Sequence, residues 1–309
     1  MIAEFKELWP EMGVDTESSP AAAMVPHRGK NFVRLLAKGK YHLKYDTKRL
    51  RVKKIRGIKR KDGTIVAQRR SALERDDPIY GNVWEVFTDT LCKFQTKMLH
   101  EGDLYAIEGR RKGMARIEVI DSKTGVRAAK LLVTVHPKRE VDVTFHFVRD
   151  QDEDGRPRMR TVWDPSVVDR WLGVLNGIFT PQANIVLRNR GSRVMNIAKD
   201  YGPSIDLEEI RDMGKRVKNR STVDVFLVGS FTGGSNPTGA HVVGSHEIVA
   251  DDRPTEELQL QTISHEIGHR LGAKHSSGRT YAKRHWLMFS SPRLGSKITN
   301  QWAINMNPW

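Results

Sequence analysis

The chain of 309 residues is predicted to be an α+β protein, with a small β-sandwich followed by a domain in which helices pack on a mixed sheet. Three observations predict this class. Short β-like segments separated by turns fill residues 31–137, helical and strand patterns alternate from residue 138 onward, and an apolar fraction of 38% suits packed cores. The length is enough for two ordinary domains.

Residues 1–30 are predicted to be a tail or linker. They contain three prolines and a run of alanines, and they show neither a helical nor a strand period. Six β-like segments follow, over residues 41–45, 50–58, 64–68, 82–87, 114–120 and 128–135. Because Asp62 and Gly63 tolerate the positive φ of a tight turn, they suit a hairpin within this series.

The last two β-like segments carry a resemblance. Residues 113–121, followed by residues 128–135, resemble the closing hairpin of bacterial immunoglobulin-like domains. The resemblance implies that residues 31–137 form such a domain, which is mostly a spacer or adhesive module.

From residue 138 to residue 309 the pattern predicts a second domain with a mixed sheet. Strands are expected over 141–148, 183–187, 223–228 and 241–250. Helices are expected over 165–178, 205–217 and 255–271.

Cys92 is the only cysteine, so no internal disulfide can form, which favours synthesis in a reducing cytoplasm. The N-terminal residues include Glu4, Lys6 and Glu7 where a signal peptide would be apolar, and no stretch is long and apolar enough to span a membrane. Action outside the cell would need lysis, a signal-independent secretion route or a particle that carries the protein. The sequence does not choose among these routes.

The net charge of +15 is concentrated in residues 28–75, which hold 18 Lys and Arg against Asp46, Asp62 and Glu74. Such a block can bind nucleic acid, anionic lipid, an acidic wall polymer or an acidic protein. A solvated basic face without a partner is the alternative.

Residues 150–155 begin like a calcium loop, with Asp150, Asp152 and Asp154 at alternate positions and a glycine at the sixth. Thr161 stands where that loop needs its bidentate glutamate. A plain acidic hairpin loop is therefore the favoured interpretation, with Ca²⁺ as the alternative.

The strongest motif is His265-Glu266-Ile267-Gly268-His269-Arg270-Leu271-Gly272-Ala273-Lys274-His275. Five residue types at fixed offsets arise by chance on the order of once in ten thousand chains of this length. On a helix, His265 and His269 stand one turn apart and away from the apolar stripe, so both can reach one ion. Gly272 ends the helix and lets His275 turn back toward the same ion.

Three neutral imidazoles leave one tetrahedral position of a zinc ion open, which is typical of catalytic sites. Glu266 is next to a ligand and is predicted to act as the general base and acid rather than as a ligand. A histidine set without metal and a zinc site without activity are the alternatives.

The extended HExxHxxGxxH signature resembles that of the metzincins, a family of zinc endopeptidases. The resemblance implies a turn bearing methionine beneath the metal, and Met288 is expected there, 13 residues after His275. It also implies that the segment before the helix pairs with extended substrate. Ser290 stands where astacin-like and serralysin-like members place a tyrosine ligand, and one cysteine cannot supply the second, cysteine-bound zinc of the archaemetzincin type.

The sequence thus predicts a zinc-dependent endopeptidase that hydrolyses protein or peptide substrates. A catalytically silent zinc-containing structural or surface-binding protein of a larger assembly is the alternative, and a basic binding module is compatible with either. The metzincin subfamily, the substrate and the oligomeric state stay open.

Overall fold

The computed structural model describes residues 1–6, 14–55, 58–59, 65–66, 102–232, 238–275, 287–288 and 296–308. The chain forms two compact units, and each is discontinuous in sequence. The first unit comprises Met1–Lys138, Gly177–Asn184 and Ile298–Trp309. The second unit comprises Arg139–Asn176 and Ile185–Lys297.

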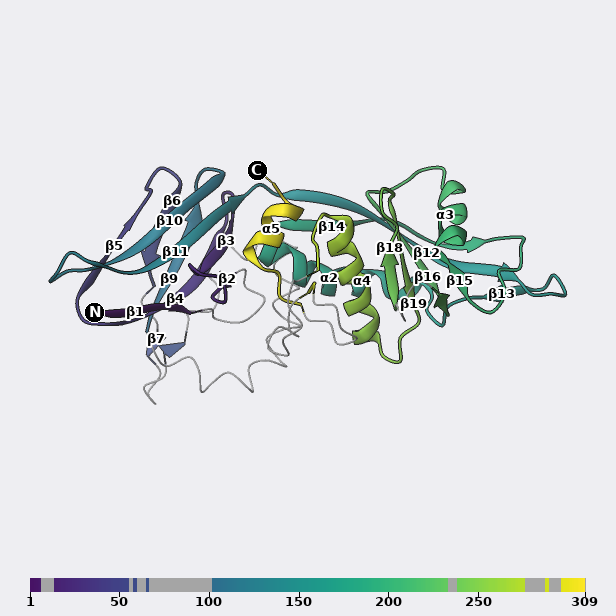
Figure 1. Cartoon of the computed structure of the whole chain (residues 1–309), viewed down its shortest axis with the longest axis horizontal. Coiled ribbons are helices and arrows are strands. Elements are labelled where there is room, and N and C mark those ends of the chain that lie inside the picture. Colours follow the sequence, from purple (N-terminus) through teal and green to yellow (C-terminus); the bar gives the residue numbers. More distant parts are fainter. Residues whose placement is uncertain are drawn as a thin grey trace. The chain divides into compact units, whose positions relative to one another are not determined.

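The first unit contains two sheets (Figure 1). One sheet has the order β1 (Ile2–Lys6), β4 (Lys30–Lys38), β9 (Asp103–Gly109) and β6 (Leu50–Lys54). The other has the order β2 (Val14–Asp15), β3 (Ala22–Pro26), β11 (Arg127–His136), β10 (Gly113–Asp121) and β5 (Tyr41–Tyr45). Neighbouring strands are antiparallel except β3 and β11. A short antiparallel pair, β7 (Ile58–Lys59) and β8 (Ile65–Val66), stands apart.

One hydrophobic core lies between the two sheets, so this unit is a β-sandwich. Val33 and Leu35 of β4 and Ile107 of β9 pack in the same cluster as Val133 of β11 and Val119 of β10. The intervening residues of these strands face outward, as the pleat requires. The strands predicted over 41–45, 114–120 and 128–135 are present, whereas the segment predicted over 82–87 lies outside the described residues.

The prediction of a tail or linker over residues 1–30 is wrong, because strands β1, β2 and β3 lie there. In β3, residues 22–25 are almost fully buried. The strand pairs in parallel with β11, which is distant in sequence and contributes to its burial. A short run of alanines carries no period of its own, so only this tertiary pairing makes it a strand.

The end of the chain also belongs to the first unit, although the sequence predicted one continuous domain over 138–309. Helix α5 (Asn300–Met306) begins at Thr299, whose hydroxyl accepts a hydrogen bond from the Trp302 amide. The Asn307 carboxamide then donates to the carbonyls of Pro137 and Ala183 at 2.8 Å each. These contacts depend on residues distant in sequence and leave no local signal.

The second unit is a mixed sheet with helices on both faces, which confirms the α+β class. Its order is β13 (Pro157–Met159), β12 (Arg139–Gln151), β16 (Val223–Val228), β19 (Glu247–Asp251) and β18 (Gly239–His241), with β14 (Ile185–Asn196) also paired to β12. Strands β14, β12, β16 and β19 run parallel, and β13 and β18 are antiparallel to their neighbours. A further parallel pair joins β15 (Ile205–Asp206) to β17 (Phe231–Thr232).

The helices cover opposite faces of this sheet. Helix α3 (Leu207–Lys215) begins with a capping box at Asp206 and buries Ile210 and Met213 against Phe226 and Val249. Helix α2 (Val168–Ala183), which follows the short turn η2 (Pro165–Val167), places the Trp171 ring 6.2 Å from that of Phe145. Residues 145 and 226 occupy opposite faces, because Phe226 pairs with residue 146.

Helix α4 (Glu256–Arg270) lies beside β18 and β19 (Figure 1). The sequence predicted a single strand over 241–250, which is wrong, because a turn splits that segment into β18 and β19. Gly244 adopts φ 80°, and the Ser245 amide donates to the Val242 carbonyl. The turn makes β18 an edge strand antiparallel to β19.

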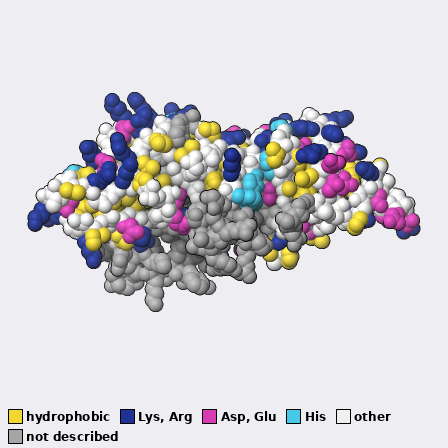
Figure 2. Space-filling model, in the orientation of Figure 1, with side chains coloured by type: hydrophobic (Ala, Val, Ile, Leu, Met, Phe, Trp, Pro, Cys, Tyr) yellow, Lys and Arg dark blue, Asp and Glu magenta, His cyan; other side chains and the backbone are white. Residues whose placement is uncertain are grey.

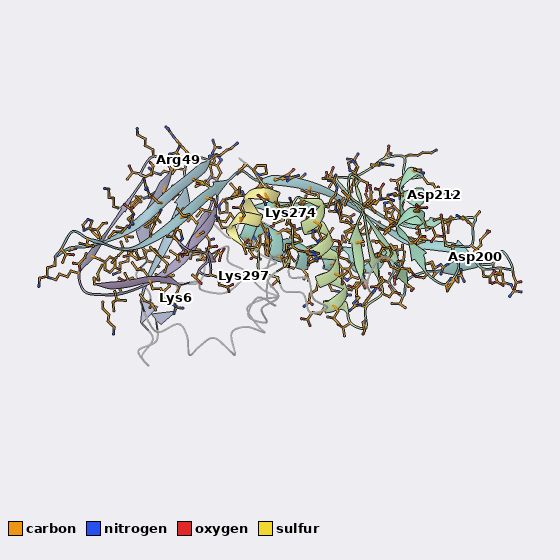
Figure 3. All side chains as sticks on the ribbon, viewed as in Figure 1. Lys6, Arg49, Asp200, Asp212, Lys274 and Lys297 are labelled. Carbon is orange, nitrogen blue, oxygen red and sulfur yellow. The ribbon has the colours of Figure 1, made fainter. Side chains whose placement is uncertain are left out.

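Lysines and arginines gather along one edge of the first unit, the upper edge in Figure 2. Arg49 is labelled at this edge in Figure 3, and Lys6 at the opposite one. No helix in the described part of the chain is long and apolar enough to cross a membrane.

Candidate metal centre

Helix α4 begins and ends at residues that cap it. The Thr255 hydroxyl accepts a hydrogen bond from the Leu258 amide at the N-terminus. At the C-terminus, Gly272 adopts φ 106°, its amide donates to the His269 carbonyl, and the Ala273 amide donates to the Gly268 carbonyl. These two bonds form a Schellman motif, which turns the chain back across the end of the helix. The predicted helix over 255–271 is therefore confirmed.

The turn brings His265, His269 and His275 together. The Nε2 atom of His275 lies 3.1 Å from that of His265 and 3.0 Å from that of His269. Nitrogens bound to one tetrahedral zinc at about 2.0–2.1 Å would lie roughly 3.3–3.4 Å apart, so little movement is needed. Among the described residues, these three are the group of ionisable side chains that could hold a metal ion.

Backbone carbonyls fix the tautomers of the two helical histidines. The Nδ1 atom of His265 lies 2.6 Å from the Leu287 carbonyl oxygen, and that of His269 lies 2.9 Å from the Ala273 carbonyl oxygen. A carbonyl can only accept, so each Nδ1 carries the proton and each Nε2 presents its lone pair. Such outer hydrogen bonds orient metal-binding imidazoles in known sites.

Burial also favours the neutral imidazoles that a metal requires. It lowers the pKa of His265 to about 3 and that of His269 to about 4, and the hydrogen bonds to the backbone carbonyls only partly oppose this. Burial lowers the pKa of His275 as well, although this side chain is more exposed than the other two. The donors and their protonation state thus fit a metal ion such as zinc.

Glu266 lies next to these ligands but outside their group. Its side chain is 7% exposed, and burial raises its pKa to about 8, which a hydrogen bond from the His241 backbone amide opposes. Strand β18 packs directly on it, because a Cβ atom on Gly239 would lie 3.2 Å from the Glu266 Cγ. A carboxyl group, one residue from a candidate metal ligand on α4, is therefore held against the edge strand.

Met288 packs against helix α4. Its side chain is fully buried, and its sulfur would lie 2.6 Å from a Cβ atom on Gly268. The preceding residue, Leu287, supplies the carbonyl that orients His265. Residues 276–286 and 289–295 lie outside the described part, and Ser290 is among them.

Sequence reasoning missed His241. It follows Gly239 by two residues on β18, so both positions face the same side of the strand, toward α4. Its Nε2 atom is buried and has no hydrogen-bond partner among the described residues, and burial lowers its pKa. A lone histidine in a strand carries no motif, and only the packing of β18 on α4 reveals its place.

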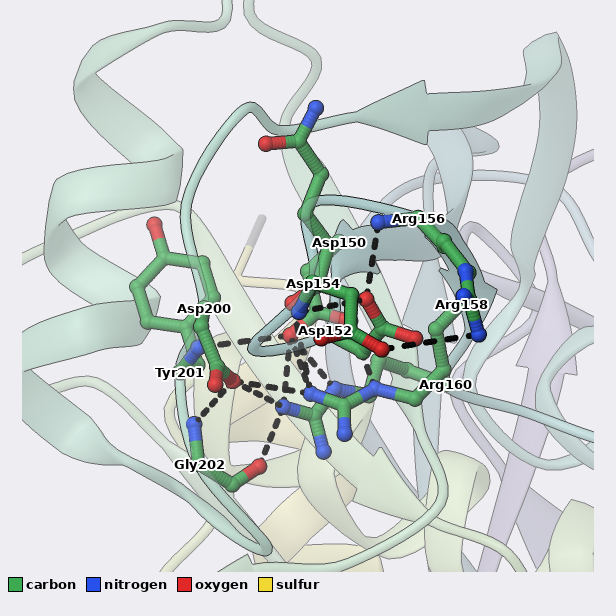
Figure 4. Close-up of polar contacts among 10 residues, drawn as sticks. Asp150, Asp152, Asp154, Arg156, Arg158, Arg160, Asp200, Tyr201 and Gly202 are labelled. Carbon is green, nitrogen blue, oxygen red and sulfur yellow. Dashed lines mark hydrogen bonds and ion pairs between the residues drawn. The ribbon is translucent and has the colours of Figure 1, made fainter.

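The acidic loop of residues 150–155 is a hairpin turn between β12 and β13 (Figure 4). Asp150 is fully buried and accepts hydrogen bonds from the guanidinium groups of Arg158 and Arg160. Asp152 accepts from the backbone amides of residues 154 and 156, and Asp154 pairs with Arg156 at 3.4 Å. Arginine side chains therefore neutralise Asp150 and Asp154 within this hairpin.

Comparisons with known proteins add little. No protein-family model matches the chain, and no curated protein matches it. Among solved structures, it is similar to archaemetzincin from Methanopyrus kandleri, with 14% identity and a TM-score of 0.38 over 54% of this chain and 93% of that one. It is also similar to a structure described as a chaperone-substrate complex, with 13% identity and a TM-score of 0.35 over 65% of this chain and 37% of that one. TM-scores this low do not establish a shared fold, so function must be argued from the site itself.

Proposed function

We propose that the chain is a zinc-dependent endopeptidase of the metzincin type. One observation carries the proposal: three imidazole Nε2 atoms converge, and Glu266, the residue after the first of these ligands on α4, holds a buried carboxyl group that is not part of their group. A purely structural zinc site is closed by four protein ligands and has no use for such a carboxyl group. Met288 beneath α4 supports the metzincin type.

When bound, zinc polarises the scissile carbonyl, lowers the pKa of a water toward about 7 and favours the ionised form of a nearby carboxyl group. Glu266 takes a proton from the attacking water as the water oxygen bonds to the carbonyl carbon. It then gives this proton to the amide nitrogen as the carbon–nitrogen bond breaks. The products are a new carboxyl group and a new amine, without a covalent enzyme intermediate.

Strand β18 supports an extended substrate. It pairs with β19 on one side, and no strand of the described residues pairs with its other side. Its backbone is fixed relative to the catalytic carboxyl group by the His241 amide and by the contact of Gly239 with Glu266. A peptide added to this edge by main-chain hydrogen bonds would lie next to Glu266.

The test is cleavage profiling with the full chain. We expect purified protein to contain about one zinc per chain and to cut peptides in a mixed library. A chelator should abolish cleavage, and added zinc should restore it. The matched control is Glu266→Gln prepared in the same way, because a contaminating protease would cut with either protein. Bound zinc with no cleavage of any peptide would instead favour a catalytically silent zinc protein.

A further inference from the structure

Three turns of the first unit lie together at one end of the β-sandwich. The Arg28 amide donates to the Gly109 carbonyl, and the Gly109 amide donates to the Gly29 carbonyl. The Arg110 amide donates to the Arg49 carbonyl at 2.7 Å. These bonds join the turn before β4, the turn between β5 and β6, and the turn between β9 and β10.

The three turns carry a dense positive charge, which we call the basic turn cluster. Its members are Arg28, Lys30, Lys48, Arg49, Arg110, Arg111 and Lys112, and all are exposed. Asp46 lies in the same turns, and it is paired with Arg49 at 2.9 Å. Within the described residues, the other six cations form no ion pair. The cluster thus extends the basic block of the sequence to residues 110–112, which only the fold brings near Arg49.

The opposite end of the same sandwich is a natural comparison. There, the Ser122 amide donates to the Lys40 carbonyl and joins the turn after β4 to the turn after β10. The exposed cations at this end are Lys38, Lys40, Lys123 and Arg127, and Arg127 is paired with Glu118 at 3.2 Å. They are fewer than in the basic turn cluster.

The chemistry of the cluster indicates which polyanion it fits. Four of its seven cations are arginines, whose planar guanidinium groups bind phosphate oxygens in pairs. No tryptophan, tyrosine or phenylalanine of the described residues is exposed, so the bases of a single strand would find no stacking surface. The turns contain no apolar side chain that could enter a bilayer. These features match a polyanion that is bound through its phosphate groups alone, without base stacking on aromatic side chains and without insertion of apolar side chains.

We propose that the basic turn cluster binds double-stranded DNA through its phosphates, without sequence preference. This interaction is separate from peptide hydrolysis, since no residue of the cluster belongs to the metal centre. Binding of this kind falls steeply with salt, because each neutralised phosphate releases counterions.

The test is fluorescence anisotropy of a labelled 20-base-pair duplex with the full chain at several salt concentrations. We expect a Kd on the order of 10⁻⁶–10⁻⁴ M near physiological salt. Arg110→Gln/Arg111→Gln/Lys112→Gln should weaken binding by at least about tenfold at low salt and reduce the salt slope by up to about 3. The control Lys38→Gln/Lys40→Gln/Lys123→Gln removes the same charge from the opposite end and should change the affinity less than threefold.

Arg28→Gln/Lys48→Gln gives an independent variant from the other two turns and should also weaken binding. Equal loss in the control would show diffuse attraction to a positive protein and would overturn the proposal. Tighter binding to single-stranded DNA, polyglutamate or phosphatidylserine vesicles than to the duplex would overturn it as well. Peptide cleavage reports the metal centre separately, so the two proposals fail independently.

Discussion

The two halves of the candidate metal centre are built differently. His265 and His269 stand on a capped helix, where His265 is buried and His269 is half-buried, and their Nδ1 atoms are held by backbone carbonyls. His275 is exposed and stands beyond the Schellman turn. The helical half is therefore ready for a metal, whereas the position of the third ligand depends on a turn. Helix α4 therefore fixes the positions of two of the three candidate ligands.

The largest expected effect concerns Glu266, the proposed general base on α4. Glu266→Gln preserves the shape and removes the basic carboxylate, so proton transfer is lost. Peptide hydrolysis should fall by about 10²- to 10⁴-fold, measured as initial rates on a cleaved library peptide. Zinc content and melting temperature should stay near those of the unmodified protein. Loss of zinc in this variant would give the residue a structural role.

Ligand removal compares the two halves directly. His269→Ala and His275→Ala should each weaken zinc binding by more than the 10- to 100-fold typical of outer-shell changes, since each leaves two protein ligands. The loss should be greater for His269→Ala, because that donor is already oriented. Competition with a chromogenic chelator measures both affinities. Unchanged affinity in His275→Ala would show that another residue is the third ligand.

Acid should destabilise the metal-free protein through the helical half. The pKa values of His265 and His269 lie near 3 and 4 in the folded chain and near 6.5 when unfolded. A lowered pKa gives stability that is complete above 6.5 and is lost as the pH falls toward 3. Between pH 7.5 and pH 5, each histidine should lower the free energy of unfolding by about 1–2 kcal/mol, measured by urea unfolding. His265→Gln/His269→Gln should flatten this dependence, and an unchanged slope would contradict the assignment.

The smallest expected effect tests whether Met288 packs against α4. The test is the sign of the change in the free energy of unfolding. Glycine to alanine inside a helix usually stabilises by about 0.5–1 kcal/mol. Gly173→Ala on α2 should do so, because no atom lies within 4 Å of the added Cβ. Gly268→Ala should instead destabilise by about 1–3 kcal/mol, because its Cβ would press on the buried Met288 sulfur. Thermal unfolding compares them, and equal stabilisation would place Met288 elsewhere.

The sequence was informative where the signals are local. Thr255 and Gly272 mark the ends of α4, and the spacing of His265, His269 and His275 implies their convergence. The carbonyls of Leu287 and Ala273 could not be predicted, because a backbone oxygen has no sequence signal and its position depends on tertiary contacts. For the same reason β3 was missed, since its burial comes from a strand about a hundred residues away.

The discontinuous first unit has a consequence for how the protein is made. Residues 298–308 complete it, yet they are synthesised after α4. Both sheets of the sandwich are complete by residue 136, whereas α5 can join them only after α4 has been synthesised. The chain crosses between the units at 138–139, 176–177, 184–185 and 297–298. A protease cut at 138–139 would place every strand of the sandwich on one fragment and α4 and α5 on the other. Because α5 packs on β3 and β11, it would hold the two fragments together without a covalent bond.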